Sequence, residues 1–191
     1  MTLGNKGDFA CNWESLGNNS NVLFRRGRKF GSTQTFDKIG SISLNYNASY
    51  SPSDTGVSYF CVYGWTQNPL IEYYIIDNWG GAPFQDPARP PGPWESDLAL
   101  MGEIIIDDGV YDIWKSVRNN MPSIEGVKTF SQYWSVRKLK RTSGIISVSE
   151  HFKKWEEVGM SLGCLYEVAL TVEGYQNTGS AEVTENTLII G

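Results

Sequence analysis

The chain has 191 residues, of which 40% are hydrophobic and 13% aromatic, and it carries a formal net charge of -5. These values exclude a disordered chain, favour one domain over residues 1–191, and argue against nucleic acid as a partner, because phosphate binding needs a basic face. No apolar run is long enough to span a membrane. No signal peptide begins the sequence, and this gives no information about secretion if the chain is a processed form.

Strand patterns fill the first half of the chain. We expect strands at residues 7–13, 22–24, 41–50 and 57–65. Four basic residues follow the second of these, at Arg25, Arg26, Arg28 and Lys29. We interpret them as a solvated edge strand, since charge on an edge discourages pairing with other chains, and ligand binding is the alternative.

The stretch Val62–Gly80 is the centre of the prediction, and it is expected to form two strands joined at residues 67–69. Side chains alternate along a strand, so Leu70, Glu72, Tyr74 and Ile76 share one face. Glu72 is a carboxylate in an apolar and aromatic run. An unpaired buried charge is costly, so this residue is a candidate functional group.

The second half begins with a Pro- and Gly-rich loop at residues 80–96, which is either a cleft rim or a plain surface excursion. Residues 110–137 are predicted to form a long hairpin, with a turn at 119–126 and Pro122 and Ser123 at its tip. A helix is predicted at 147–160, a last long strand at 166–175, and a tail at 184–191. Many strands and a single α-helix indicate an all-β fold, a β-jelly roll sandwich with a cleft on one concave, aromatic sheet face.

A second carboxylate repeats the pattern of the first. Glu173 lies near the end of the last long strand, two residues from Tyr175 on the same face. Two carboxylates that face each other across a cleft are what glycoside hydrolysis requires. The alternative is a pair of exposed or salt-bridged glutamates.

The cysteines and the histidine suggest no metal site, and no cofactor is expected. Cys11, Cys61 and Cys164 lack metal-ligand spacing, and we interpret them as buried small hydrophobes, with one disulfide among them as the alternative. The lone His151 is interpreted as a packed structural residue.

Six segments, in order, resemble glycoside hydrolase family 11, the endo-β-1,4-xylanases. They are YGW at 63–65, NPLIEYYI at 68–75, VYDIW at 110–114, PSIEG at 122–126, QYWSVR at 132–137 and EGYQNTGSA at 173–181. The resemblance implies, more specifically, a jelly roll of two curved antiparallel sheets with a deep cleft, likened to a partly closed hand, and a retaining double displacement. It further implies that Glu72 is the nucleophile and Glu173 the general acid/base, about 5–5.5 Å apart.

Other residues carry over from the same motifs, with core packing as the alternative for the aromatic ones. Tyr63 and Tyr74 would bond the nucleophile and the sugar, and the hairpin tip at Pro122 and Ser123 would act as a thumb. The resemblance assigns the remaining substrate-binding roles to Trp65, Arg118, Gln132, Trp134 and Tyr175.

Two departures from the family pattern affect these expectations. The chain begins after the family's first strand or two, including an early Trp that stacks on substrate, so it is either a trimmed form or builds that subsite otherwise. Residues 18–21 hold a short insertion, and Asn21 is expected to contact the acid/base. Asp at this place marks acid-adapted members, so we expect a pH optimum nearer neutral than strongly acidic.

The sequence therefore predicts a secreted, monomeric endo-1,4-β-xylanase that binds xylan and xylo-oligosaccharides, with secretion inferred from the polymeric substrate. Two alternatives stay open at this point. One is a non-catalytic glycan-binding jelly roll that uses the same aromatic cleft, and the other is a β-1,4-glucanase.

Overall fold

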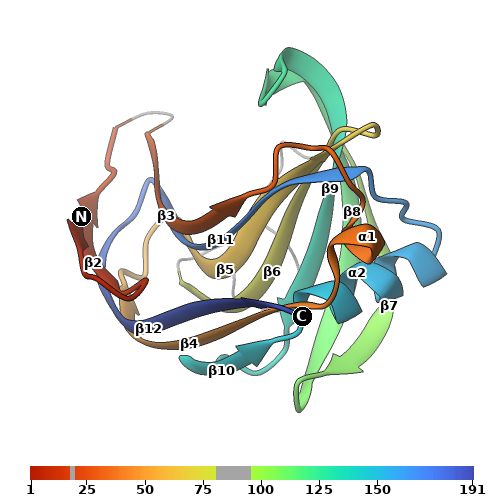
Figure 1. The fold of residues 1–191 in the computed structure, drawn as a ribbon. Helices are drawn as coiled ribbons and strands as arrows, with labels where there is room; N and C mark the ends of the chain where they lie inside the picture. The colour runs from red at the N-terminus through yellow and green to blue at the C-terminus, as the bar shows by residue number, and fades with distance from the viewer. Residues whose placement is uncertain (18–19, 81–95) are drawn as a thin grey trace.

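The computed structural model describes residues 1–17, 20–80 and 96–191, and it consists of two curved β-sheets stacked on each other (Figure 1). The smaller sheet has the strand order β1 (Thr2–Leu3), β2 (Phe9–Glu14), β12 (Thr178–Ile190), β4 (Ile42–Pro52) and β10 (Ser143–Ile146). The larger sheet has the order β3 (Asn21–Lys29), β11 (Cys164–Tyr175), β5 (Val57–Gln67), β6 (Ile71–Gly80), β9 (Gly126–Arg137), β8 (Gly109–Ser123) and β7 (Ser96–Ile106).

The predicted all-β sandwich is confirmed, with one change to its pairing. Neighbouring strands run antiparallel throughout the described sheets except β6 and β9, which run parallel. Sequence patterns could not reveal this pair, because β9 returns from the long hairpin and joins a strand more than fifty positions earlier in the chain.

The two central strands of the larger sheet, β5 and β6, are buried on both faces. One face packs Phe60 and Tyr73 into the core between the sheets, and the other gathers Tyr63, Tyr74 and Ile76 into a second apolar cluster. This division follows the two-residue alternation predicted for β6. The second cluster lies on the concave face of the curved sheet.

The main helix, α2 (Val148–Glu157), packs against the core-side face of the larger sheet, opposite the concave face (Figure 1). Its Phe152 ring meets Tyr73 edge-on, with ring centroids 5.0 Å apart. A second helix, α1 (Phe36–Ile39), was absent from the prediction of a single helix. Four residues make about one turn, which is too short to produce a periodic apolar pattern.

The predicted tail at 184–191 is wrong, because β12 continues through this segment to Ile190 and pairs with β4 along its length. A register shift between Val183 and Glu185 breaks the alternation where the tail was expected to begin. Asn186, which is buried, donates to the backbone oxygens of Gly7 (3.1 Å) and Arg26 (3.2 Å). The segment is thus an integral strand.

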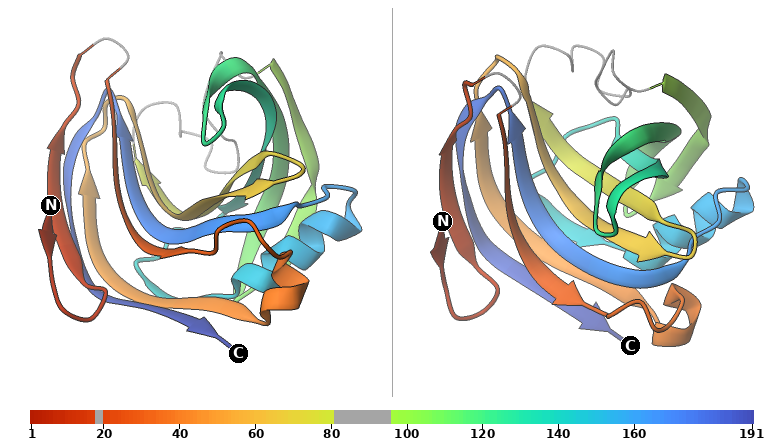
Figure 2. Two further views of the ribbon diagram at one scale, coloured as in Figure 1. Left: turned by 45° about the horizontal axis from the view of Figure 1, so that its top comes forward. Right: turned by 90° about the horizontal axis from the view of Figure 1, so that it is seen from above.

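The long hairpin predicted at residues 110–137 is confirmed as β8 and β9. Its turn is shorter than the expected 119–126, since pairing continues to Ser123 and Gly126. Both views in Figure 2 show its tip curling over the concave face of the larger sheet. The predicted loop at 80–96 lies outside the described residues except for its ends, Gly80 in β6 and Ser96 in β7.

Three smaller predictions can also be compared with the structure. The basic cluster falls on β3, which is an edge strand as expected. All three cysteines are free, with Cys11 and Cys61 buried and Cys164 half-buried, so the disulfide alternative is wrong. His151 is fully buried, and burial lowers its pKa to about 3, so it is a neutral packed residue as interpreted.

Over the described ranges, no helix is sufficiently long and apolar to pass through a bilayer.

Candidate active site

Glu72 occupies the middle of the larger sheet, between β5 and β9. Its register partners are Trp65 on β5 and Gln132 on β9. Alternation along β6 turns Glu72 and Tyr74 toward the concave face, while Tyr73 enters the core. Glu72, the carboxylate within an apolar stretch of the sequence, therefore faces the cleft.

The Glu72 carboxylate accepts three hydrogen bonds. Tyr63 and Tyr74 donate to Oε1 at 2.8 and 3.2 Å, and the Gln132 amide donates to Oε2 at 2.6 Å. Burial raises the pKa of Glu72 above its ordinary value, and these donors and the positive charge of Arg118 offset only part of that rise. Three donors favour the ionised form and fix both oxygens in place.

A second set of hydrogen bonds orients the side chains that donate to Glu72. The Trp65 indole donates to the Tyr63 hydroxyl at 2.6 Å. The Trp134 indole donates to Ser116 Oγ at 3.1 Å, and Ser116 donates to Gln132 Oε1 at 3.2 Å, which orients the amide nitrogen toward Glu72. The sequence reasoning missed Ser116, because only the β8–β9 register places it opposite Gln132.

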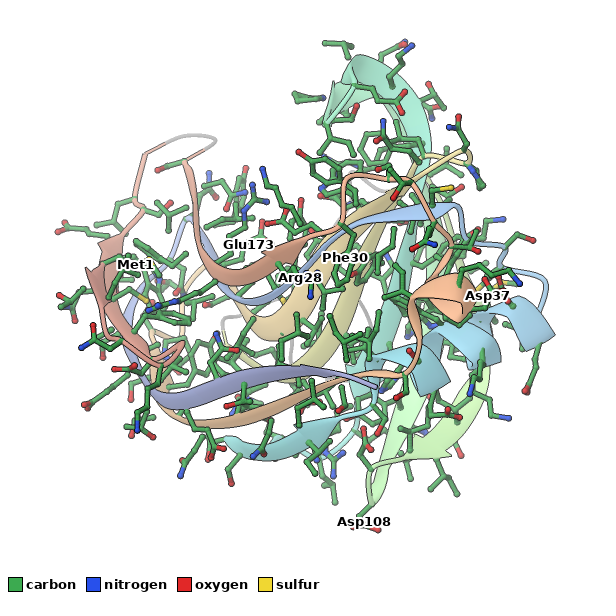
Figure 3. All side chains as sticks on the ribbon, in the orientation of Figure 1. Met1, Arg28, Phe30, Asp37, Asp108 and Glu173 are labelled. Atoms are coloured by element: carbon green, nitrogen blue, oxygen red, sulfur yellow. The ribbon has the colours of Figure 1, made fainter. Side chains whose placement is uncertain are left out.

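Glu173 has fewer partners. It lies on β11 opposite Leu23 and Tyr59, and Figure 3 labels it. Its Oε1 accepts one hydrogen bond, from Asn21 Nδ2 at 2.9 Å, and its Oε2 is buried with no hydrogen-bond partner among the described residues. Burial raises the pKa of Glu173, the Asn21 bond lowers it, the charge of Glu72 raises it, the Tyr74 hydroxyl and the charge of Arg118 lower it, and the net pKa is about 7. Glu173 thus tends to keep a proton near neutral pH.

Both carboxylates line the same cleft on the concave face. It consists of two hollows of about 670 and 320 Å³. Both hollows are lined by Asn21, Glu72, Tyr74, Pro122 and Glu173. Each glutamate is 9% exposed, and neither takes part in a salt bridge within the described residues. The structure thus favours a facing pair over exposed or ion-paired glutamates.

The other residues predicted for the site also line this cleft. The larger hollow adds Arg118, Gln132, Trp134 and Tyr175, and the smaller adds Tyr63, Trp65 and Ser123. Two of them have a structural task as well. Trp134 stacks on Tyr74 with ring centroids 4.2 Å apart, and the Ser123 hydroxyl donates to the Gly126 backbone oxygen at 2.7 Å within the hairpin turn.

Several lining residues were not assigned to the site from the sequence. They are Val57, Tyr59, Met121 and Phe130 in the larger hollow, and Leu23 and Ile124 in the smaller. The smaller hollow is also lined by Arg25, from the basic cluster for which ligand binding was the alternative interpretation. Strand alternation could have identified some of them, since Tyr59 is in phase with Tyr63 on β5, and Leu23 and Arg25 are in phase with Asn21 on β3. Within the described ranges, no cluster of three or more His, Cys, Asp or Glu side chains could hold a metal ion.

Comparison with known proteins gives one family. Residues 1–184 match the family described as Glycosyl hydrolases family 11. An "Endo-1,4-beta-xylanase A" of Bacillus pumilus is 54% identical over 191 residues, which are all of this chain and 76% of that protein. A protein of the same description from Thermoclostridium stercorarium is 51% identical, and the chain spans only 27% of its length.

Solved structures agree with the sequence comparison. The structure of "the family 11 xylanase from Neocallimastix patriciarum" superposes with a TM-score of 0.85 at 40% identity. The match covers 100% of this chain and 85% of that one. Sequence and structure comparisons thus agree over both sheets, including the larger one that carries Glu72 and Glu173, and the chain belongs to glycosyl hydrolase family 11.

Proposed function

We propose that this chain is an endo-1,4-β-xylanase that cleaves internal β-1,4-xylosidic bonds with retention of anomeric configuration. The observation that carries the proposal is the unequal environment of the two facing carboxylates. Glu72 has three donors that favour its charge, and Glu173 has one donor and a pKa raised to about 7. One group is suited to attack and the other to carry a proton.

In the first step, the Glu173 carboxylic acid gives its proton to the glycosidic oxygen as the bond between that oxygen and the anomeric carbon breaks. A Glu72 oxygen forms a bond to the same carbon from the opposite face, giving a covalent glycosyl ester and inverting the configuration. Tyr63, Tyr74 and Gln132 keep the attacking carboxylate in one orientation, which reduces the entropic cost of reaching the transition state.

In the second step, the Glu173 carboxylate takes a proton from water, and the water oxygen attacks the anomeric carbon. The ester bond to Glu72 breaks, and a second inversion restores the original configuration. Glu173 ends protonated and Glu72 ionised, so the starting state is regenerated.

The substrate follows from the relatives, whose printed descriptions are those of xylanases. We propose xylan and xylo-oligosaccharides as partners, and we expect the close walls of the cleft to reject the hydroxymethyl group of glucose chains. A polymeric substrate requires an enzyme outside the cell, so we propose that the chain is secreted and works as a monomer. Its net charge of -5 makes nucleic acid an unsuitable partner.

The test compares sugar release from xylan and carboxymethylcellulose by the wild type and by Glu72→Ala and Glu173→Ala. We expect activity on xylan only, and each substitution should lower kcat about a thousandfold because it removes a reacting group. Glu156→Ala, at an exposed position on α2, is the matched control, and circular dichroism checks the fold of every variant. Xylan binding without hydrolysis by the wild type would instead support a glycan-binding protein.

Azide separates the two roles. In Glu72→Ala, azide can replace the nucleophile directly, and one inversion yields an α-xylosyl azide. In Glu173→Ala, azide attacks the covalent intermediate formed from a substrate with a good leaving group, and two inversions yield a β-xylosyl azide. The reverse assignment of products, or an inverted first product from the wild type, would contradict the proposed mechanism.

A further inference from the structure

Arg25 lies in the smaller hollow of the cleft, where neither the motifs nor the two-carboxylate mechanism gives it a role. It lines this hollow together with Tyr63, Trp65 and Ser123. Its side chain is 38% exposed. Among the described lining residues of both hollows, Arg25 and Arg118 are the cationic ones, and Arg118 lines the other hollow.

Two contacts hold the guanidinium in place. Its Nη1 lies 3.4 Å from Oε2 of Glu167, whose side chain is only 7% exposed. Its Cζ lies 5.7 Å from the centroid of the Tyr63 ring, the same ring whose hydroxyl bonds Glu72. A charged partner and an aromatic ring together restrain the position of the guanidinium.

The strand register explains how Arg25 reaches this place. Arg25 lies opposite Thr171 on β11, the next pair on the same face is Gly27 and Ala169, and Tyr63 lies opposite Ala169 on β5. Gly27 has no side chain, and a Cβ there would come within 2.1 Å of the Val168 backbone oxygen, so the two strands approach closely at this pair. Because Gly27 and Ala169 are small, the long Arg25 side chain can extend over them to Tyr63 and Glu167.

We propose that Arg25 is a sugar-binding residue at this end of the cleft, where it donates hydrogen bonds to hydroxyl groups of a backbone xylose unit beyond the one attacked. A guanidinium has five N–H donors in a flat fork, and the ion pair with Glu167 involves only one of its nitrogens. The remaining donors are available to neighbouring oxygens such as the vicinal hydroxyls of a pyranose ring. Glu167 is a positioning residue that acts through Arg25.

The surrounding charge favours hydroxyl groups over a carboxylate branch on the xylan chain. Glu167 already compensates the charge of Arg25, and Glu72 and Glu173 line the same hollow. A substrate carboxylate would meet this excess of negative charge, whereas a neutral hydroxyl can accept a hydrogen bond without repulsion. The inference rests on the proposed xylanase function and adds one contact to it.

The test measures kcat and KM for short and long reducing-end-labelled xylo-oligosaccharides, with cleavage positions, for Arg25→Ala, Arg25→Lys and Glu167→Gln. Arg28→Ala is the matched control, since it removes an exposed arginine from the same edge strand (Figure 3). Arg25→Ala should lower kcat/KM for long oligosaccharides about tenfold, because hydrogen bonds to a charged group are lost. The loss should appear in KM, cleavage positions should shift, and short substrates should be unaffected.

The other variants sharpen the result. Arg25→Lys keeps the charge but loses the fork, so it should recover only part of the affinity, and Glu167→Gln should show a smaller loss of the same kind. An equal fall in kcat for every chain length would mean that Arg25 acts only through Tyr63, which would overturn the proposal. So would a loss confined to uronate-branched xylan, or no change at all. Failure of the wild type to cleave any xylan would instead refute the proposed function.

Discussion

At the scale of single residues, the site places two glutamates of similar burial in different hydrogen-bonding environments. Glu72 and Glu173 are equally buried, so burial alone would treat them alike. The difference comes from their partners, three donors against one. Because each donor stabilises a carboxylate relative to the neutral acid, the proton shared by the pair resides mainly on Glu173.

The pH dependence of kcat/KM tests this division. The proposed mechanism needs Glu173 protonated and Glu72 ionised, so activity should fall as pH rises through about 7, where Glu173 loses its proton. It should also fall on the acid side, as Glu72 becomes protonated. Asn21→Ala removes a donor that lowers the pKa of Glu173, so its alkaline limb should move to higher pH. A wild-type profile that peaks below about 4 would contradict the assignment.

At the scale of elements, the strand β12 shows a role that its sequence hid. Its last residues pair with β4, and the Asn186 side chain also reaches the Gly7 backbone before β2 and the Arg26 backbone on β3. The element therefore links the smaller sheet to the edge strand that carries Asn21 and Arg25. Its stability supports one wall of the cleft.

Replacing Asn186 tests the importance of this link. Asn186→Ala leaves two backbone carbonyls without their donor, and we expect it to lower the free energy of unfolding by about 1–3 kcal/mol. Chemical denaturation measures the change. Glu185→Ala, at the exposed neighbouring position, should stay within about 0.5 kcal/mol of wild type. Equal effects of the two substitutions would show that the segment behaves as the tail predicted from the sequence.

At the scale of the whole molecule, a buried polar cluster joins the two sheets. Asp77 on β6 is fully buried, and it accepts hydrogen bonds from Tyr111 on β8 and Tyr46 on β4, each at 2.7 Å. The Arg141 guanidinium, between β9 and β10, donates to it at 2.6 Å. One carboxylate thus connects three segments far apart in sequence, on the side of the larger sheet opposite the cleft.

Removal of this carboxylate should be costly. Asp77→Ala would leave the partly buried charge of Arg141 without its partner, and we expect a loss of about 3–5 kcal/mol of unfolding free energy. The denaturant midpoint should fall while the m-value stays constant, as for a change in stability alone. Asp37→Ala, which removes an exposed ion pair with Lys38, should cost at most about 1 kcal/mol. A comparable loss in both variants would rule out the special role of the cluster.

Local patterns in the sequence were sufficient for much of this protein. Two-residue alternation placed Glu72 and Tyr74 on the same face, the long hairpin was recognised from its flanking strands and turn, and six motifs indicated the family. These features depend on neighbours in the chain, so they can be read without the fold.

Only the tertiary structure decided which partners each side chain has. It placed Ser116 on Gln132, Arg25 between Tyr63 and Glu167, and Asp77 among Tyr46, Tyr111 and Arg141. It also joined β6 to β9 in parallel and made a strand of the predicted tail. The physical reason is that burial and hydrogen bonding, which set pKa values and fix binding groups, come from residues on different strands whose register no local pattern specifies.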